Sequence, residues 1–362
     1  MSVNSGDLEK LLAELISIKT YRRNPEIVNF LKKALKDNGW KNVRESGGNV
    51  WGSIGSGGIK IVYDIHSDTI RAGSPAWKTD PFKAVVKSGR IYGRGAVDDK
   101  GPLAAAIFAG NFIKPDAGYK VYLLASDREE IDEGYGCRIF IAKEKIKPDY
   151  AVISEPSGLK LAVGQRGRTE FYLNAAGIPA HGSTPEKGKN AVYIINEAVN
   201  KIKKIKFKRV PPFSNTIATP TVLSSQGDGI NALPSSCGLY LDVRINHKDR
   251  AADIRKKILK TIPPGISVKT GRVCKAWLLK DRVLLKASRQ AYKKVFGSAP
   301  EPYYWGFCTN GSEYIKYGIP VVGFGPGDPG MAHRDNEMIK FSDVEKAVGF
   351  FAVLPEHIGS VK

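Results

Sequence analysis

The sequence of 362 residues has no apolar stretch long enough to span a membrane. We also expect no secretion signal, because residues 1–15 are a polar start followed by an amphipathic helical pattern. Its four cysteines, at positions 137, 237, 274 and 308, are far apart and include no Cys-x-x-Cys pair. These absences exclude an integral membrane protein and a disulfide-rich secreted domain. They predict a cytoplasmic protein whose cysteines are reduced thiols.

Acidic residues are scarce relative to basic ones, and the net charge is +20. Such a charge attracts nucleic acid, an anionic surface or an acidic partner. The lysines are spread over predicted helix faces, as in 201–208, and no Lys/Arg cluster alternates with stacking aromatic residues. The sequence therefore argues against nucleic acid as a partner and leaves an acidic protein partner open.

The chain also lacks internal repeats and low-complexity segments. It is too long for one ordinary core, so we expect two domains. Strand-like and helix-like segments alternate up to residue 166 and again from 278, which predicts an α/β fold. Residues 167–277 follow the ferredoxin-like order β-α-β-β-α-β. We therefore predict one domain built from 1–166 and 278–362, with 167–277 inserted into it.

Metal-type side chains follow four of the predicted strands and precede one predicted helix. They are His66 and Asp68 after residues 59–65, Glu129 and Glu130 after 121–125, Glu155 after 150–153, His333 after 320–324, and Asp98 before 103–113. In an open α/β sheet, such strand ends meet in one crevice. Carboxylates and imidazoles gathered there suit a hydrolase with two zinc ions.

Two zinc ions about 3.5–4 Å apart need a carboxylate between them. The predicted ligands are His66 and Glu155 for one ion, Glu130 and His333 for the other, and Asp98 for both. Glu129, next to a ligand, is the candidate general base for the water between the ions. Asp68 lies two residues from His66 and is the candidate acceptor for the second imidazole N–H. Cobalt or manganese also suits such a site.

Each of these residues has an ordinary alternative explanation. A lone His-x-Asp is often structural, Asp98 is also placed to cap a helix, and adjacent glutamates on a surface turn are usually solvated. Their coincidence favours a site, because the chain has only five histidines and two of them fall where ligands are required.

Five segments, in this order along the chain, resemble a known family. They are residues 66–68, 93–101, 129–130, 154–157 and 332–337. They resemble the zinc-dependent peptidases and deacylases that include acetylornithine deacetylase, succinyl-diaminopimelate desuccinylase and carboxypeptidase G. Residues 164–168, 181–186 and 308–311 are most similar to YgeY-type hydrolases within that family. The stretch 93–105 is also similar to the lysine-carrier hydrolases.

The resemblance implies a mixed-sheet catalytic domain, a ferredoxin-like insertion that serves as lid and dimerisation domain, and a homodimer. It implies that His181 reaches an active site, often that of the partner subunit, and polarises the scissile carbonyl. Arg244 and Asn231 match positions that bind substrate in the family. Asn310 and Gly311 are expected to line the substrate slot.

The activity that the resemblance implies is hydrolysis of an amide bond next to a free carboxylate. The substrate is then an N-acyl amino acid or a short peptide, cleaved by a deacylase or a carboxypeptidase-like enzyme. Two alternatives remain open. One is a dipeptidase or aminopeptidase on the same scaffold, and the other is a hydrolase that releases an amino acid from an acidic carrier protein, which the charge of +20 would suit.

Overall fold

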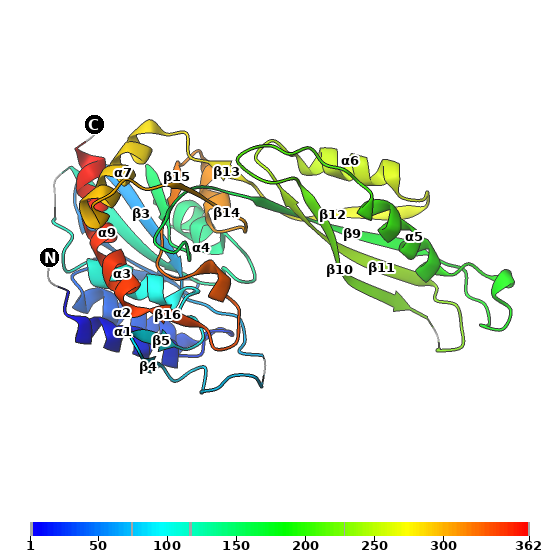
Figure 1. Ribbon diagram of the computed structural model, residues 1–362, viewed down its shortest axis with the longest axis horizontal. Coiled ribbons are helices and arrows are strands. Elements are labelled where there is room, and N and C mark those ends of the chain that lie inside the picture. Colours follow the sequence, from blue (N-terminus) through cyan, green and yellow to red (C-terminus); the bar gives the residue numbers. More distant parts are fainter. Residues whose placement is uncertain (1–2, 74, 116–117, 228, 361–362) are drawn as a thin grey trace. The chain divides into compact units, whose positions relative to one another are not determined.

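The computed structural model describes residues 3–73, 75–115, 118–227 and 229–360. The chain divides into two compact units, each with its own hydrophobic core (Figure 1). Unit 1 comprises Met1–Gly164, Leu278–Trp305 and Thr309–Lys362, and unit 2 comprises Gln165–Trp277 and Gly306–Cys308. No helix in the described part of the chain has both the length and the hydropathy needed to cross a membrane.

Unit 1 contains a large sheet, a small sheet and two layers of helices. Its strands are β1 (Lys41–Ser46), β2 (Asn49–Gly55), β3 (Ile59–His66), β4 (Val85–Lys87), β5 (Arg90–Tyr92), β6 (Tyr119–Ser126), β7 (Tyr150–Ile153), β8 (Leu161–Gln165), β13 (Trp277–Leu278), β14 (Pro302–Trp305), β15 (Val321–Gly323) and β16 (Met338–Lys340). Its helices are α1 (Ser5–Ser17), α2 (Pro25–Asp37), α3 (Lys100–Ala109), α4 (Tyr135–Arg138), α7 (Arg282–Phe296), α8 (Gly311–Tyr314) and α9 (Phe341–Gly359), with short helical turns η1 (Ile139–Lys143), η3 (Ile315–Tyr317) and η4 (Pro329–Met331).

The large sheet has the order β1-β2-β6-β3-β7-β15-β8-β13, with β14 paired to β8. Its centre, β6-β3-β7-β15, is parallel, whereas β1, β2 and β8 pair antiparallel to their neighbours. Helices α1, α3, α7 and α9 pack together on one face, and α4 lies against the other (Figure 1). The predicted mixed sheet is therefore confirmed. Its parallel centre is covered on both faces, which explains why β7 is a continuous apolar run and why β3 is buried from Ile61 to His66.

Two helices show how the sequence sets this packing. In α1, Leu8, Leu11, Leu12 and Leu15 are buried at the spacing of one helix face, and Asn4 caps the first turn. Helix α3 is different, because every residue from Lys100 to Ala109 is buried. Small side chains let α3 lie close to α1 and α9, so the loop before it is held firmly against the end of the sheet.

Unit 2 contains β9 (Gly167–Ala176), the turn η2 (Pro185–Lys187), α5 (Ala191–Lys203), β10 (Ile217–Gln226), β11 (Ser236–Ile245), α6 (Ala251–Thr261) and β12 (Ile266–Cys274). The strands form an antiparallel sheet in the order β10-β11-β9-β12. This is the β-α-β-β-α-β order predicted for the insertion. Side chains of β9 and β11 that point to one face pack with α5 and α6 to make the core of unit 2.

The helix that the sequence pattern predicts over residues 135–145 is present, but its geometry changes part-way. Residues 135–138 form α4, and residues 139–143 continue as the wider helical turn η1. A Cβ on Gly136 would lie 2.4 Å from Cβ of Ser126, so glycine is required for α4 to lie this close to β6. This packing depends on contacts with β6, so the local pattern of apolar residues cannot predict it.

Candidate metal centre

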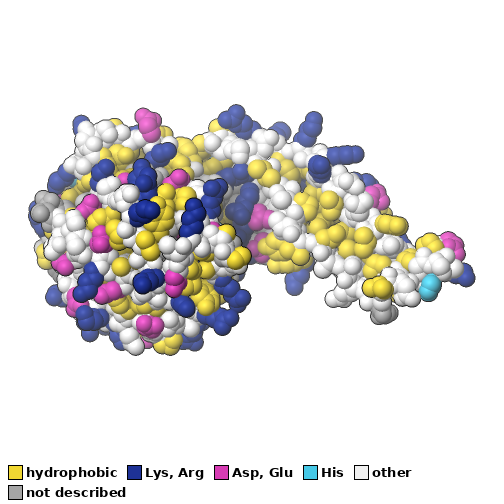
Figure 2. Space-filling view, turned by 60° about the horizontal axis from the view of Figure 1, so that its bottom comes forward, with side chains coloured by type: hydrophobic (Ala, Val, Ile, Leu, Met, Phe, Trp, Pro, Cys, Tyr) yellow, Lys and Arg dark blue, Asp and Glu magenta, His cyan; other side chains and the backbone are white. Residues whose placement is uncertain are grey.

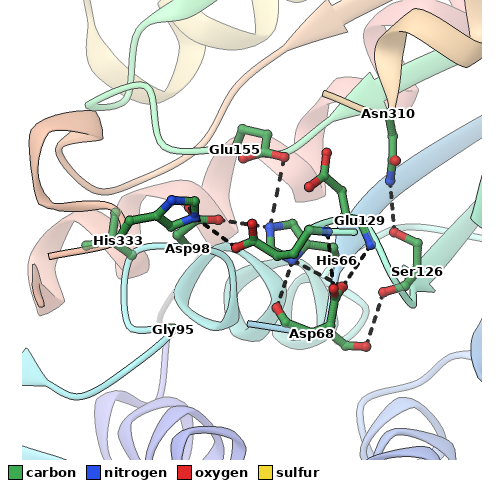
Figure 3. Close-up of polar contacts among 12 residues, drawn as sticks. His66, Asp68, Gly95, Asp98, Ser126, Glu129, Glu155, Asn310 and His333 are labelled. Carbon is green, nitrogen blue, oxygen red and sulfur yellow. Dashed lines mark hydrogen bonds and ion pairs between the residues drawn. The ribbon is translucent and has the colours of Figure 1, made fainter. Parts of the chain in front are cut away.

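The predicted metal ligands come together at one edge of the large sheet (Figure 3). Because β6, β3, β7 and β15 are adjacent and parallel, their carboxyl ends lie along the same edge. His66 is the last residue of β3, Glu155 lies two residues after β7, and Glu130 lies four residues after β6. Asp98 comes from the loop before α3, and His333 from the loop after η4.

Asp98 lies between the two histidines. Its Oδ1 is 2.9 Å from Nε2 of His66, and its Oδ2 is 3.2 Å from Nε2 of His333. Each histidine also has a glutamate beside it. Oε1 of Glu130 is 2.9 Å from Nε2 of His333, and Oε1 of Glu155 is 4.0 Å from Nε2 of His66.

This donor set fits a pair of divalent cations. Ligand atoms at about 2.0–2.2 Å from a shared tetrahedral zinc lie roughly 3.4 Å from each other. The four distances between imidazole nitrogen and carboxylate oxygen, from 2.9 to 4.0 Å, bracket that spacing. Among the described residues, ligand atoms within 4.8 Å of one another form two groups, His66 with Asp98 and Glu130, and His66 with Asp99 and Glu155. The chemistry suits zinc, cobalt or manganese.

The carboxylates also change the proton affinities within the cluster. In the metal-free protein, Asp98 and Glu130 raise the pKa of His333 to about 10, although burial acts in the opposite direction. Burial tends to raise the pKa of Asp98, but its hydrogen bonds to His333 and His66 lower it overall. A cation that bound here would displace the imidazole protons, because histidine binds metals in its neutral form.

Two residues of the cluster region adopt a left-handed backbone conformation. His333 has a φ of 64°, and Arg128, which precedes Glu129, has a φ of 63°. This conformation costs free energy for a residue with a Cβ and is concentrated at functional sites. At position 333 this conformation directs the side chain of His333 into the cluster, and at position 128 it directs the side chain of the next residue, Glu129. Both observations support a functional role for this edge of the sheet.

Asp68 lies beside Nδ1 of His66, as predicted, but its main chain is nearer to the ring than its carboxylate is. Nδ1 of His66 lies 2.9 Å from the backbone carbonyl oxygen of Asp68 and 3.5 Å from its carboxylate. The carboxylate instead accepts the backbone N–H groups of Glu129, at 3.1 Å, and Glu130, at 3.2 Å. Asp68 therefore orients His66 through its main chain and holds the Glu129–Glu130 turn through its side chain.

Glu129 is buried, with 8% of its surface exposed, and its Oε1 has no hydrogen-bond partner among the described residues. Burial raises the pKa of this carboxyl group well above its ordinary value, and the negative charge of Glu155 raises it further. A carboxylate with this raised proton affinity is suited to accept a proton near neutral pH.

Asn310 is only 2% exposed and is held within unit 1. Its Nδ2 donates to Oδ1 of Asp64 and to Oγ of Ser126, both at 3.0 Å, and its Oδ1 accepts from the backbone N–H of Gly134 at 2.6 Å. Both amide hydrogens of Asn310 are therefore donated within unit 1, and neither remains for the predicted contact with substrate. Gly311, also buried, begins α8.

The remaining predicted residues belong to unit 2. His181 is exposed, and its Nδ1 lies 2.7 Å from Oγ of Ser183. The segment of Asn231 lies alongside it, because Gly182 donates its N–H to the carbonyl of Asn231 at 2.7 Å. Arg244 is paired with Asp242 through Nε at 2.8 Å and Nη2 at 3.2 Å. Action of these residues at the metal cluster stays a prediction.

Three buried charged groups next to the cluster were not singled out from the sequence. Neither carboxylate oxygen of Asp99 has a hydrogen-bond partner among the described residues, and burial raises its pKa well above the ordinary value. Lys100 donates from Nζ to the carbonyl of Ile18 at 2.6 Å, and burial lowers its pKa to about 7. Glu337 is completely buried. All three lie in the motifs 93–101 and 332–337, and motif membership was the only signal that could have drawn attention to them.

Comparison with known proteins now assigns the family. The sequence profile of peptidase family M20/M25/M40 matches residues 62–357, which include every predicted metal ligand. The chain belongs to this family. The resemblance inferred from the five motifs is therefore confirmed.

Two relatives of this M20/M25/M40 member span most of its length. The Escherichia coli (strain K12) protein YgeY is 27% identical and covers 97% of this chain and 94% of its own. An acetylornithine deacetylase of Buchnera aphidicola subsp. Schizaphis graminum is 30% identical and covers 82% and 80%. A tripeptidase from Staphylococcus aureus has a similar fold, with a TM-score of 0.80, 21% identity and 99% coverage of both chains.

Proposed function

We propose that this member of the M20/M25/M40 family hydrolyses an amide bond next to a free carboxylate, as a deacylase of N-acyl amino acids or as a carboxypeptidase-like enzyme. One observation carries the proposal: the two oxygens of Asp98 face the imidazoles of His66 and His333. A single carboxylate between two histidines, each with its own glutamate, is the donor set of a dinuclear hydrolase. Acetylornithine deacetylase among the relatives supports the choice of substrate class.

His66 and Glu155 would hold one divalent cation, Glu130 and His333 the other, and Asp98 both. Such cations lower the pKa of a bound water and polarise a carbonyl group, which is the chemistry they supply when bound. Zinc is the preferred metal, with cobalt or manganese as substitutes.

Glu129 acts as the general base in this proposal. Its unpaired, buried oxygen takes a proton from the attacking water and later delivers it to the leaving amine. Asp68 supports this step, because its carboxylate fixes the backbone N–H groups of Glu129 and Glu130. A pKa raised towards neutrality suits both halves of the transfer, because the group can then accept a proton and still release it near the working pH.

Residues of unit 2 would bind the rest of the substrate. His181 would stabilise the developing oxyanion, and Arg244 with Asn231 would bind the substrate carboxylate. Asp242 already engages Nε and Nη2 of Arg244, so Nη1 is the guanidinium nitrogen offered to a ligand. In the homodimer that the resemblance implies, His181 would serve the site of the partner subunit.

Two observations favour alternative substrates. Membership in a peptidase family favours a dipeptidase or aminopeptidase on the same scaffold. The charge of +20 favours release of an amino acid from an acidic carrier protein. Figure 2 shows Lys and Arg side chains distributed over the visible face of the molecule.

The test is metal analysis combined with a substrate screen. Zinc-loaded protein is assayed against N-acylated basic and dicarboxylic amino acids, dipeptides with free amino groups, and an aminoacylated acidic carrier protein. We expect two zinc ions per chain and fastest cleavage of the N-acyl amino acids. Absence of any amide hydrolysis by protein with two bound zinc ions would refute the proposed activity, and preference for the dipeptides or the carrier would select an alternative.

A further inference from the structure

Glu337 is a completely buried carboxylate to which the proposed mechanism assigns no role. It accepts four hydrogen bonds, two at each oxygen. Oε2 accepts from Nη1 of Arg94 at 2.7 Å and from the backbone N–H of Gly95 at 3.1 Å. Oε1 accepts from the backbone N–H groups of Val97 at 2.7 Å and Asp98 at 3.0 Å. Every acceptor position of this carboxylate therefore faces one short segment, residues 94–98.

The main chain reinforces the same contact. Strand β16 pairs with β5, and beyond the end of that pairing Gly93 donates its N–H to the carbonyl of Glu337 at 3.0 Å. The segment that follows Gly93 then folds around the Glu337 side chain. More than 230 residues of sequence separate the two partners, so the carboxylate joins distant parts of the chain.

Both joined segments carry proposed metal ligands. The carboxylate holds the backbone N–H of Asp98 itself, the residue between the two histidines. Glu337 also lies four residues after His333, in the same loop, directly before β16. Oδ2 of Asp98 lies 3.2 Å from Nε2 of His333. A displacement of Glu337 relative to residues 94–98 would therefore change this distance.

We propose that Glu337 is a positioning residue that fixes Asp98 and the His333 loop at the spacing required to bind two cations. This inference rests on the proposed metal-dependent function. Glu337 contacts neither substrate nor metal in this assignment, and acts only through the backbone of Asp98 and the loop that bears His333. Its effect should therefore appear as a change in cation affinity and coordination geometry.

The negative charge of Glu337 is balanced by the guanidinium of Arg94. Arg94 is buried, its guanidinium lies 2.7 Å from Oε2, and it stacks over Trp77 with 5.1 Å between the guanidinium carbon and the ring centroid. Replacement by glutamine would keep the shape but convert one acceptor oxygen into an amide donor. Two of the four N–H groups would then face a donor, and an unpaired buried donor is unfavourable. The loop would relax away from the side chain.

The experiment compares Glu337→Gln with the wild-type chain. Metal-free proteins are titrated with Zn²⁺ and with Co²⁺ by calorimetry, and the visible absorption of the Co²⁺ forms is recorded. We expect cation affinity to fall by about 10- to 100-fold, as is typical when a group that orients a ligand is removed. The Co²⁺ absorption bands should shift, because the coordination geometry changes.

Glu170→Gln is the matched control. Glu170 is also buried, pairs with Arg168 at 3.3 Å and accepts the backbone N–H of Arg272 at 3.2 Å, but it lies in unit 2. It should lower thermal stability without changing cation affinity or the Co²⁺ spectrum. Wild-type affinity and spectrum in a folded Glu337→Gln protein would overturn the inference.

Glu337→Asp provides a second variant if the glutamine variant does not fold. It retains the charge that pairs with Arg94, but the side chain is one methylene shorter and cannot reach both Val97 and Asp98. We expect its Zn²⁺ affinity to lie between those of the wild type and Glu337→Gln. Affinity equal to the wild type would contradict the positioning role. Failure of the wild-type chain to bind two cations would refute the proposed function instead, so the two failures are distinguishable.

Discussion

At the scale of single residues, the raised proton affinity of Glu129 is the feature most directly tied to catalysis. Glu129→Gln keeps the shape of the side chain but cannot accept a proton. We expect kcat to fall by about 10²- to 10⁴-fold, the usual contribution of a general base. Zinc content should remain at two ions per chain, because Glu129 is not a proposed ligand. Glu133→Gln is the neighbouring control: its charge adds only a lesser contribution to the raised pKa of Glu129, so kcat should change little. A near wild-type rate for Glu129→Gln would show that the base is another group.

Replacing Asp98 should have a different effect from replacing Glu129, because the variant should lose its bound zinc. Asp98→Ala removes the carboxylate that lies between His66 and His333. We expect bound zinc, measured by mass spectrometry after dialysis, to fall towards none. Asp335→Ala, two residues from His333, should retain both ions. Two zinc ions still bound to Asp98→Ala would contradict the shared-ligand assignment.

Most of the candidate ligands could be predicted from sequence because they follow apolar strands whose parallel ends meet, and Asp98 because it precedes a helix. The partners that orient those ligands could not. His66 is oriented by a carbonyl of Asp68, a group that every residue carries. Asn310 bonds with Asp64 and Ser126, which lie 246 and 184 residues away in sequence. Such contacts arise from the packing of the whole unit and leave no local pattern.

At the scale of helices and strands, the same distinction applies. Helix α7 could be predicted because Asp281 caps its first turn and an amphipathic pattern ends at Gly297, which has a left-handed φ of 76°. Strands β4, β5 and β16 have only three residues each and were not predicted. Their sheet forms because residues 338–340 return to residues 90–92, so the pairing partner, and not the local sequence, makes them strands.

Helix α3 provides a prediction at this scale. A Cβ on Gly101 would lie 2.3 Å from the carbonyl oxygen of Ala96 and 2.9 Å from Cδ1 of Ile339. Alanine normally stabilises a helix interior by about 1 kcal/mol relative to glycine. At Gly101 the clash with backbone should outweigh this gain and destabilise by about 1–3 kcal/mol. Chemical denaturation measures the difference.

Gly349→Ala in α9 is the comparison, because its nearest contact would be a side-chain methyl of Val295 at 3.2 Å, which can move. We expect its free energy of unfolding to stay close to that of the wild type. Because Gly101 follows Asp98 by three residues, Gly101→Ala should also weaken zinc binding. Equal stability of the two variants would show that α3 tolerates a shift of its first turn.

At the scale of the whole molecule, the implied homodimer can be tested by mixing inactive chains. His181→Ala should reduce kcat with little change in bound zinc, and Glu129→Gln should be inactive for a different reason. If His181 acts on the partner subunit, a mixed dimer contains one site with both residues intact. Unfolding and refolding the two variants together should then restore up to about a quarter of wild-type activity on statistical grounds. No recovery in verified mixed dimers would assign His181 to the site of its own chain.

The two separate hydrophobic cores give a final prediction about metal removal. All proposed ligands lie in unit 1, so cations bound there stabilise that unit alone. A ligand at 100 times its dissociation constant adds about 2.7 kcal/mol to the free energy of unfolding. Removing it also leaves the carboxylates of Asp98 and Glu130 with only the protonated imidazole of His333 and its neighbours to balance their charge. Adding a chelator should therefore lower the unfolding temperature of one transition, that of unit 1, by several degrees, as measured by calorimetry.

The other transition, that of unit 2, should keep its temperature, because its core contains none of the ligands. Asp98→Ala identifies which transition belongs to the metal centre, since its scan should no longer respond to the chelator. If both transitions move together, metal binding in unit 1 is coupled to the stability of the inserted unit. If neither moves, the cluster does not hold a cation strongly enough to stabilise the fold, and the dinuclear centre is wrong.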